Sequence, residues 1–157
     1  MTGFEIALVL NQALVAATVG SSTGAYPYAA GLRYDVDVNQ PPGAQVRNID
    51  VNIRLQPDAW APLNPTRTYR IVTNSFIAGG RDGYLAFADI AEDSVLNTYT
   101  EYATAFIDYC LEQGVIRNPS LDTFSTKSFT AETTSTVDVD PTHPAEGSTT
   151  RCTKRKQ

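Results

Sequence analysis

The sequence predicts an α+β domain in which a mixed β-sheet is packed by two long helices, followed by a disordered C-terminal tail. Two stretches, 3–17 and 98–113, begin with the spacing of a capping box and carry an apolar face. Three stretches alternate apolar and polar residues as half-buried strands do, namely 29–38, 46–55 and 68–74. The 157 residues form one domain of ordinary size, long enough to bury a sizeable core.

The first helix is expected to begin at once, because Thr2 and Glu5 stand at the positions of a capping box. Its apolar residues, among them Ile6, Leu10 and Leu14, form one broad face through about residue 17. We expect this face to pack under the sheet. The Gly- and Ser-rich run 19–24 then ends the helix.

The first two strands are expected to form a hairpin. The alternation in 29–38 is broken by the Pro- and Gly-rich loop 39–43 and resumes in 46–55. The third strand, 68–74, is compact and leads directly into a glycine-rich segment. Together the three strands predict a small mixed sheet.

The second helix is predicted from Thr98 and Glu101, which repeat the capping-box spacing, and from an apolar face that includes Cys110. The domain is expected to span 1–124. From 125 to 157, 13 of 33 residues are Ser or Thr and few are large and apolar. Such a segment cannot offset the entropy of its own ordering, so we expect disorder from about residue 130.

The charge and hydropathy of the chain exclude several classes of function. The net charge is −5, and four of the twelve basic residues fall within 151–157, so the body of the chain repels a phosphate backbone and nucleic-acid binding is not expected. The longest apolar run, 6–10, is too short to span a membrane. No basic segment precedes it, so we expect either an intracellular protein or an N-terminus that is not the native start.

Histidine and cysteine are scarce, which limits metal and nucleophilic chemistry. His143 lies in the predicted tail beside Asp138 and Asp140, where it is either a metal ligand or, as we favour, a solvated linker residue. Cys110 is expected to be a buried small hydrophobe and Cys152 an exposed free thiol, rather than a disulfide pair. No site with two histidine ligands or four cysteines can be built from this chain.

Alternating carboxylates also occur at Asp35 and Asp37, within the first predicted strand. They could bind a cation, but alternate charges on a strand normally mark its solvent-facing side. We favour the solvent-facing interpretation.

A glycine-rich segment, 79–83, precedes an aromatic residue. The glycines permit a tight turn or a close approach of the backbone to a ligand, and composition alone favours the turn. Tyr84 follows the segment directly, and Tyr26 ends a second Gly-containing loop. Two tyrosines on separate loops could enclose a flat ring, because stacking of a base on an aromatic side chain is worth about 1–3 kcal/mol.

Several segments, taken in order, resemble the C-terminal domain of the 5′-nucleotidases and UDP-sugar hydrolases. They are Thr2-Gly3 at the start of a helix, STGAY at 22–26, AGLRYD at 30–35, and the highly specific YRIVTNSFIAGGRDGY at 69–84. The resemblance covers about residues 2–115.

The resemblance implies a two-domain enzyme that hydrolyses nucleotide phosphate esters. An N-terminal metallophosphoesterase domain holds two divalent metal ions through Asp, His and Asn ligands, and the C-terminal domain recognises the nucleotide or nucleoside. In such proteins two aromatic residues sandwich the base, and those positions here are Tyr26 and Tyr84. Asp89 is the expected polar contact to the nucleoside. Family members are commonly periplasmic, secreted or attached to the cell surface.

The chain also departs from the family pattern. The metal-binding motifs are missing, so we expect no cofactor in this chain and no hydrolysis by it alone. The upstream strand region is missing too, so Met1 resembles the start of a fragment, with a metallophosphoesterase domain in the same or another chain as its partner. Both aromatic positions are Tyr where many members have Phe.

Two alternatives remain. The first is a non-enzymatic nucleotide-binding or protein-interaction module, whose open sheet edge another chain could pair. The second, which we disfavour, is an independent enzyme that uses the Asp cluster and His143.

Overall fold

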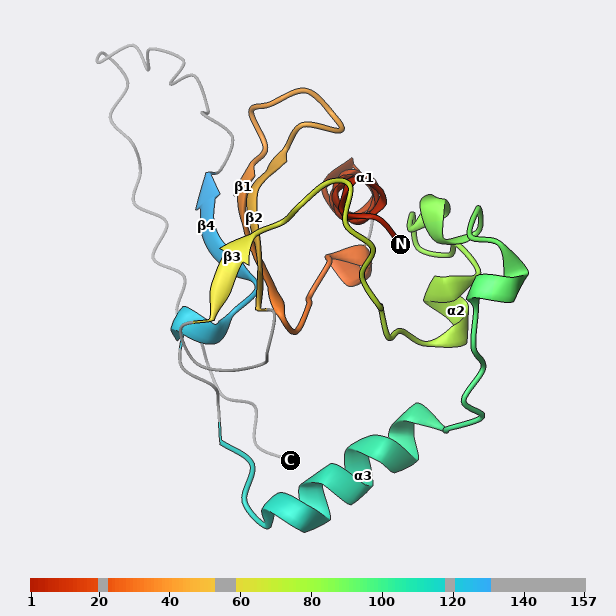
Figure 1. Ribbon diagram of the computed structural model, residues 1–157. Helices are drawn as coiled ribbons and strands as arrows, with labels where there is room; N and C mark the ends of the chain where they lie inside the picture. The colour runs from red at the N-terminus through yellow and green to blue at the C-terminus, as the bar shows by residue number, and fades with distance from the viewer. Residues whose placement is uncertain (20–22, 53–58, 118–120, 131–157) are drawn as a thin grey trace, which may run out of the picture.

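The computed structural model describes residues 1–19, 23–52, 59–117 and 121–130, and confirms the α+β class. Its four-stranded mixed sheet has the order β3-β2-β1-β4, and helix α1 lies against one face of it (Figure 1). The strands are β1 (Leu32–Asp37), β2 (Val46–Asn52), β3 (Trp60–Pro62) and β4 (Thr126–Thr130). The α-helices are α1 (Gly3–Val19), α2 (Ser75–Ala78) and α3 (Tyr102–Gln113), and short 3₁₀ turns are η1 (Thr23–Ala25), η2 (Leu85–Phe87), η3 (Glu92–Ser94) and η4 (Leu121–Thr123).

Helix α1 begins where its capping box predicts. The Thr2 amide donates to Glu5 Oε2 at 2.6 Å, and the Glu5 amide donates to Thr2 Oγ1 at 3.3 Å. Hydrogen bonds from the Thr2 backbone and side chain lower the pKa of Glu5. The helix continues to Val19, two residues beyond the predicted end.

The core lies between α1 and the central strands. Leu14, Tyr34 and Val36 are almost completely buried, and Ile6, Leu10 and Val46 complete the same cluster. Burial of each large apolar side chain contributes about 1.5–3 kcal/mol. The apolar face of α1 that the sequence predicted is therefore the face that packs against β1 and β2.

A buried asparagine links α1 to β2. Asn11 donates through Nδ2 to the Ala7 carbonyl at 2.9 Å and accepts through Oδ1 from the Val46 amide, also at 2.9 Å. The Val46 amide belongs to the first residue of β2 and is buried. The amide side chain thus satisfies two backbone groups at once, one on each element.

The predicted hairpin is confirmed. β1 pairs antiparallel with β2, with Arg33 opposite Asp50 and Val36 opposite Val46. A bulge between Arg33 and Asp35 shifts the register. β1 is shorter than the predicted 29–38, and residues 53–55 of the second predicted strand lie outside the described ranges.

The third predicted strand, 68–74, is wrong. β3 pairs with β2 instead. The start of the segment 68–74 pairs with the N-terminus of the chain, where Thr68 forms an antiparallel bridge with Thr2 and Tyr69 exchanges two backbone hydrogen bonds with Met1. Among the described residues no strand pairs with 70–73. The residue types of this segment favour a strand, but a strand also needs a neighbouring strand to pair with.

The beginning of the predicted tail is a strand. β4 pairs parallel with β1, and the Tyr34 amide donates to the Ser125 carbonyl at 2.7 Å at the start of this pairing. Residues 126–130 therefore belong to the sheet, although the domain was expected to end at 124. Without β4, β1 would be an edge strand with unpaired backbone groups, and the composition of 125–157 does not reveal that this segment supplies the partner. The predicted disorder falls on 131–157, which lie outside the described residues.

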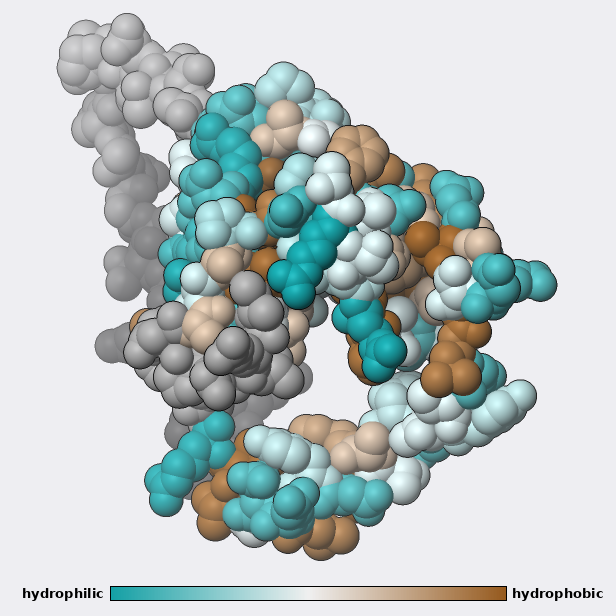
Figure 2. Space-filling model, viewed as in Figure 1, coloured by the Kyte–Doolittle hydropathy of each residue, from teal (hydrophilic) through white to brown (hydrophobic). Residues whose placement is uncertain are grey.

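The second long helix is confirmed, but it begins later than predicted and does not pack on the sheet. Glu101 is its N-cap and accepts from the Thr104 amide at 3.1 Å, so Thr98 is not part of a capping box. Figure 1 shows α3 apart from the sheet and α1, and Figure 2 shows open space between α3 and the rest of the molecule. None of its residues is buried, and Cys110, expected in the core, is half-buried. Of the two long helices, α1 alone covers the sheet.

The glycine-rich segment lies against α1. Gly83 adopts a φ of +82°, and a Cβ placed there would meet Ala16 Cβ at 2.4 Å. Three residues on, the Ala86 amide donates to Gln12 Oε1 at 2.9 Å. The segment forms turns, as the composition indicated, and its glycine also allows the close approach to the helix.

We predict that Asn11→Leu lowers the free energy of unfolding by about 1–3 kcal/mol, because the buried Val46 amide loses its acceptor. Urea unfolding followed by circular dichroism measures the change. Thr18→Leu is the control: Thr18 also donates to a carbonyl of α1, at 2.9 Å, but it is exposed, so water replaces the bond. Equal losses for the two variants would contradict this role of Asn11.

We predict that Gly83→Ala destabilises the protein more than Gly43→Ala. Both glycines have positive φ, +82° and +92°, but a Cβ at Gly43 meets nothing within 4 Å. Both variants carry backbone strain of about 1–2 kcal/mol, and only Gly83→Ala adds a clash with Ala16, worth about 1–3 kcal/mol. Thermal and urea unfolding of the two variants measure the difference. The packing argument fails if Gly43→Ala is the more destabilised.

Candidate functional site

A cavity of about 820 Å³ lies beside α1. Its walls come from α1, the connection 27–32, the segment 67–74 and the turns around α2 and η2. Ile6, Leu10 and Leu32 give it an apolar floor. The volume is within the range of about 300–1,000 Å³ that is typical of small-molecule sites.

Tyr84 lines this cavity and is half-buried. Its position follows from the contact between Gly83 and α1, and its amide donates to the Arg81 carbonyl at 3.1 Å. The ring of Phe87 lies 6.2 Å away, centroid to centroid, at an interplanar angle of 30°. Burial, together with the charge of Asp82, raises the pKa of Tyr84. The structure therefore presents a supported aromatic ring at the cavity wall.

Tyr26 has a different environment. It is half-buried against the core cluster, its hydroxyl shares a 2.8 Å hydrogen bond with Thr126 Oγ1, and burial raises its pKa. Tyr26 is not among the residues that line the cavity, but Tyr28 is. The two rings are 5.0 Å apart and tilted by 50°, and Tyr28 is 83% exposed. The sequence analysis missed Tyr28, although the YPY run at 26–28 offered it.

Tyr26 and Tyr84 nevertheless lie in one region of the molecule, around Tyr34. Burial and the nearby hydroxyl of Tyr26 raise the pKa of Tyr34 to about 12, and Tyr84 adds to the shift. The Tyr34 hydroxyl itself donates to the Pro27 carbonyl. One predicted ring, Tyr84, thus lies in the cavity wall, and the other, Tyr26, packs half-buried against the core cluster and does not line the cavity.

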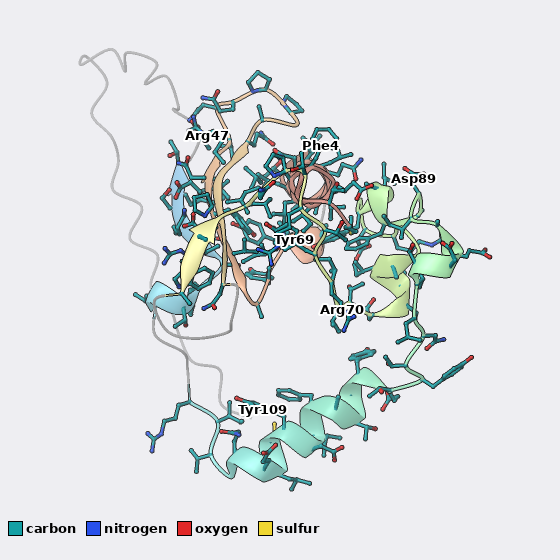
Figure 3. All side chains as sticks on the ribbon, in the orientation of Figure 1. Phe4, Arg47, Tyr69, Arg70, Asp89 and Tyr109 are labelled. Atoms are coloured by element: carbon teal, nitrogen blue, oxygen red, sulfur yellow. The ribbon has the colours of Figure 1, made fainter. Side chains whose placement is uncertain are left out.

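Asp89 lies away from the cavity. It is exposed, follows η2, and does not line the cavity. In Figure 3 it lies on the outer side of its segment, apart from Tyr69 and Arg70, which both line the cavity. Its predicted contact with the nucleoside stays a prediction.

Two arginines at the cavity, Arg67 and Arg70, were also missed by the sequence analysis. The Arg67 guanidinium lies over the Tyr69 ring, 5.6 Å from its centroid. The spacing of Arg67 and Arg70 in the sequence gave no indication of a site. The two residues line the cavity because the segment 67–74 runs along its wall.

The carboxylates of the first two strands are engaged by neighbouring side chains. Asp37 pairs with Arg47 at 2.7 Å, and hydrogen bonds from Gln40 and Asn39 lower its pKa against the effect of burial. Asp37 is buried, so the interpretation of these charges as purely solvent-facing is wrong for this residue.

Asp35 and Asp50 are held in the same way. Asp35 accepts from Asn48 and Ser128, each at 2.7 Å, and Asp50 pairs with Arg33 at 3.0 Å and Lys127 at 3.1 Å. Burial by itself would raise the pKa of both carboxyl groups. The hydrogen bonds and positive charges of these partners outweigh burial, so both pKa values are lower than usual.

The described residues do not form a metal centre. Within the described part of the chain, no three His, Cys, Asp or Glu side chains gather as metal ligands. His143, Asp138, Asp140 and Cys152 fall outside that part. No catalytic step through a metal is therefore assigned to these residues. No helix in the described ranges is long and apolar enough to cross a membrane.

Comparison with known proteins identifies the family. Residues 1–89 match the family "5′-nucleotidase, C-terminal domain". The chain is 35% identical over 115 residues to an NAD 5′-nucleotidase of Haemophilus influenzae, covering 69% of this chain and 19% of the relative. It is 36% identical over 101 residues to a probable 5′-nucleotidase of Treponema pallidum, covering 61% and 17%.

Comparison with solved structures points to the same family. The structure of a 5′-nucleotidase precursor from Thermus thermophilus matches 84% of this chain, with a TM-score of 0.71 and 27% identity, and the match covers 24% of that protein. The chain thus spans about a sixth to a quarter of the length of these relatives. Because the family match covers more than half of its residues, the chain belongs to the 5′-nucleotidase C-terminal domain family.

Proposed function

We propose that this chain recognises the nucleotide in phosphate-ester hydrolysis of the 5′-nucleotidase type. The observation that carries the proposal is the ring of Tyr84, which lines a cavity large enough for a mononucleotide and is fixed there by the contact of Gly83 with Ala16. Family membership supports the nucleotide as ligand.

Recognition rests on stacking. A base on the Tyr84 ring gains about 1–3 kcal/mol, and the apolar floor beneath it excludes water. The second ring of the clamp was predicted to be Tyr26. Because Tyr28 reaches the cavity and contacts Tyr26 at 5.0 Å, we propose that Tyr28 closes the clamp while Tyr26 holds it in place.

Hydrolysis itself is assigned to a metallophosphoesterase domain, in the same or another chain, which carries two divalent metal ions. The much greater length of the relatives supports this division, and their names describe them as nucleotidases. This chain then contributes binding and orientation, which lower the barrier without supplying a reactive group. A location outside the cytoplasm is part of the proposal, supported by the name of the Thermus relative as a precursor.

A second candidate function is a nucleotide-binding or protein-interaction module without hydrolysis. The apolar side chains of α3 favour it, because Tyr102, Phe106 and Leu111 are 74%, 63% and 76% exposed. Exposed apolar patches of this kind commonly mark interaction surfaces.

We predict that Tyr84→Ala weakens binding of AMP and adenosine at least about tenfold, because one stacking contact is lost. Tyr84→Phe retains the ring and is expected to bind within about twofold of the native chain. Isothermal titration calorimetry measures both. Tyr102→Ala removes an exposed tyrosine on α3 and serves as the control.

The same titrations of Tyr26→Ala and Tyr28→Ala separate the two candidates for the second ring. Loss of affinity in Tyr28→Ala with a smaller loss in Tyr26→Ala agrees with the cavity geometry. Binding that survives the loss of Tyr84 together with both of these rings would contradict the clamp.

We predict that the purified 157-residue chain releases no phosphate from AMP in the presence of Mg²⁺, Mn²⁺ or Zn²⁺, because its described residues form no metal-ligand cluster. A colorimetric phosphate assay measures the release. A full-length relative is the positive control. Metal-dependent release by this chain would show that it is an enzyme in its own right.

A further inference from the structure

The segment 70–73 consists of strand-forming residues that have no strand partner. Its sequence, RIVT, is rich in β-branched residues, and it runs without helix or turn from the bridge at Thr68 to α2 (Figure 1). Among the described residues, none forms a backbone hydrogen bond with 70–73 or pairs with them in the sheet. Unpaired amide and carbonyl groups of this kind are a template on which another strand can add.

This template is exposed and held at both ends. All four residues are exposed, and Val72 is 91% exposed although its side chain is apolar. Before the segment, Tyr69 exchanges two backbone hydrogen bonds with Met1. After it, Asn74 caps α2 by accepting from the Ile77 amide at 2.9 Å. Because both ends are fixed, the backbone loses little further entropy when it pairs with a strand.

Helix α3 presents a second unpartnered surface across the open space that Figure 2 shows. Tyr102, Phe106 and Tyr109 follow the helical period and share one face, and they are 74%, 63% and 52% exposed. In Figure 3, Tyr109 lies on the side of α3 toward the body, and Arg70 lies at the edge of the body toward α3. The apolar face of α3 therefore looks toward the segment 70–73.

The helix side of this open space is acidic. Residues 91–116 carry five acidic and no basic side chains. Within the described ranges, neither Asp108 nor Glu112 of α3 forms an ion pair. These charges favour a basic occupant. Because α3 is joined to the rest of the chain at both ends, the space suits one extended segment better than a folded second copy.

We propose that the open space between 70–73 and α3 binds an extended segment of another polypeptide by strand addition. The segment pairs with the backbone of 70–73, covers the aromatic face of α3 with alternate apolar side chains, and is flanked by basic residues. In binding of this kind the main chain provides affinity, and the surfaces that receive alternate side chains provide specificity. The proposal goes beyond nucleotide recognition. Because 70–73 also line the cavity, the added strand extends one of its walls.

The test is hydrogen exchange of the full chain, followed by NMR, with a short synthetic peptide. The peptide alternates valine and threonine and carries lysine at each end. In the free chain the amides of 70–73 are expected to exchange rapidly. With peptide at about ten times its Kd, two alternate amides of the four are expected to exchange about tenfold more slowly, because successive amides of a strand point to opposite edges.

Two control peptides separate the contributions to binding. The same peptide with N-methylated valines cannot donate from those residues to the carbonyls of 70–73, and it is expected to give no protection. A peptide with glutamate in place of the terminal lysines is expected to bind at least about threefold more weakly, because the acidic residues around α3 repel it.

Variants of α3 test the second wall. Phe106→Ser/Tyr109→Ser is expected to weaken peptide binding at least about tenfold, since two apolar contacts are lost. Leu111→Ser is the matched control: Leu111 is 76% exposed, but the helical period places it on the opposite side of α3. It is expected to bind within about twofold of the native chain. Circular dichroism verifies that α3 is retained in each variant.

Several outcomes would overturn the inference. Slow exchange of 70–73 in the free chain at low concentration would mean that another part of this chain already pairs with them. Protection that rises with protein concentration, together with dimers in sedimentation velocity, would assign the surface to a second copy. Absence of protection by the lysine peptide, or equal protection by its N-methylated form, would exclude strand addition. Equal weakening by Leu111→Ser and by the double variant would remove α3 from the site.

Discussion

The packing of α1 onto β1 and β2 is the interaction on which the rest of the structure depends. Leu14 and Tyr34 are fully buried in this seam, and Asn11 joins the helix to the Val46 amide. The two ends of α1 position the segments around the cavity. Its N-terminal end forms backbone hydrogen bonds with the segment 67–69, and near its C-terminal end Ala16 packs closely against Gly83. A helix held rigidly by the sheet thereby fixes two walls of the cavity that come from distant parts of the sequence.

This arrangement supports the proposed role in recognition rather than in bond cleavage. The cavity is lined by an aromatic ring, an apolar floor and two arginines, side chains that are suited to contacting a ligand. The described carboxylates of the strands are instead engaged by basic and amide side chains, as Asp37 is by Arg47. The residues that line the cavity and the ion-paired carboxylates therefore occupy separate regions. The exposed face of α3 adds a surface whose apolar side chains meet solvent.

Local features were predictable wherever neighbouring residues decide them. The capping box at Thr2 set the start of α1, and the alternation of 46–55 set a strand of the hairpin. Tyr84 was singled out because a glycine-rich segment precedes it, and the structure places it in the cavity wall. The strand predicted at 68–74 failed, and β4 was missed, because strand formation requires a partner that the segment's own residues do not specify.

The sequence by itself determined the fold class, the family resemblance, the start of α1 at its capping box, and the presence of an aromatic ring after a glycine-rich turn. Only the tertiary structure decided that Tyr28 rather than Tyr26 lines the cavity, that Arg67 and Arg70 stand at its wall, and that α3 lies apart from the sheet. The physical reason is how far apart in the sequence the interacting residues lie. Caps and turns close hydrogen bonds within a few residues, whereas a cavity is formed by packing between segments whose meeting depends on the whole core.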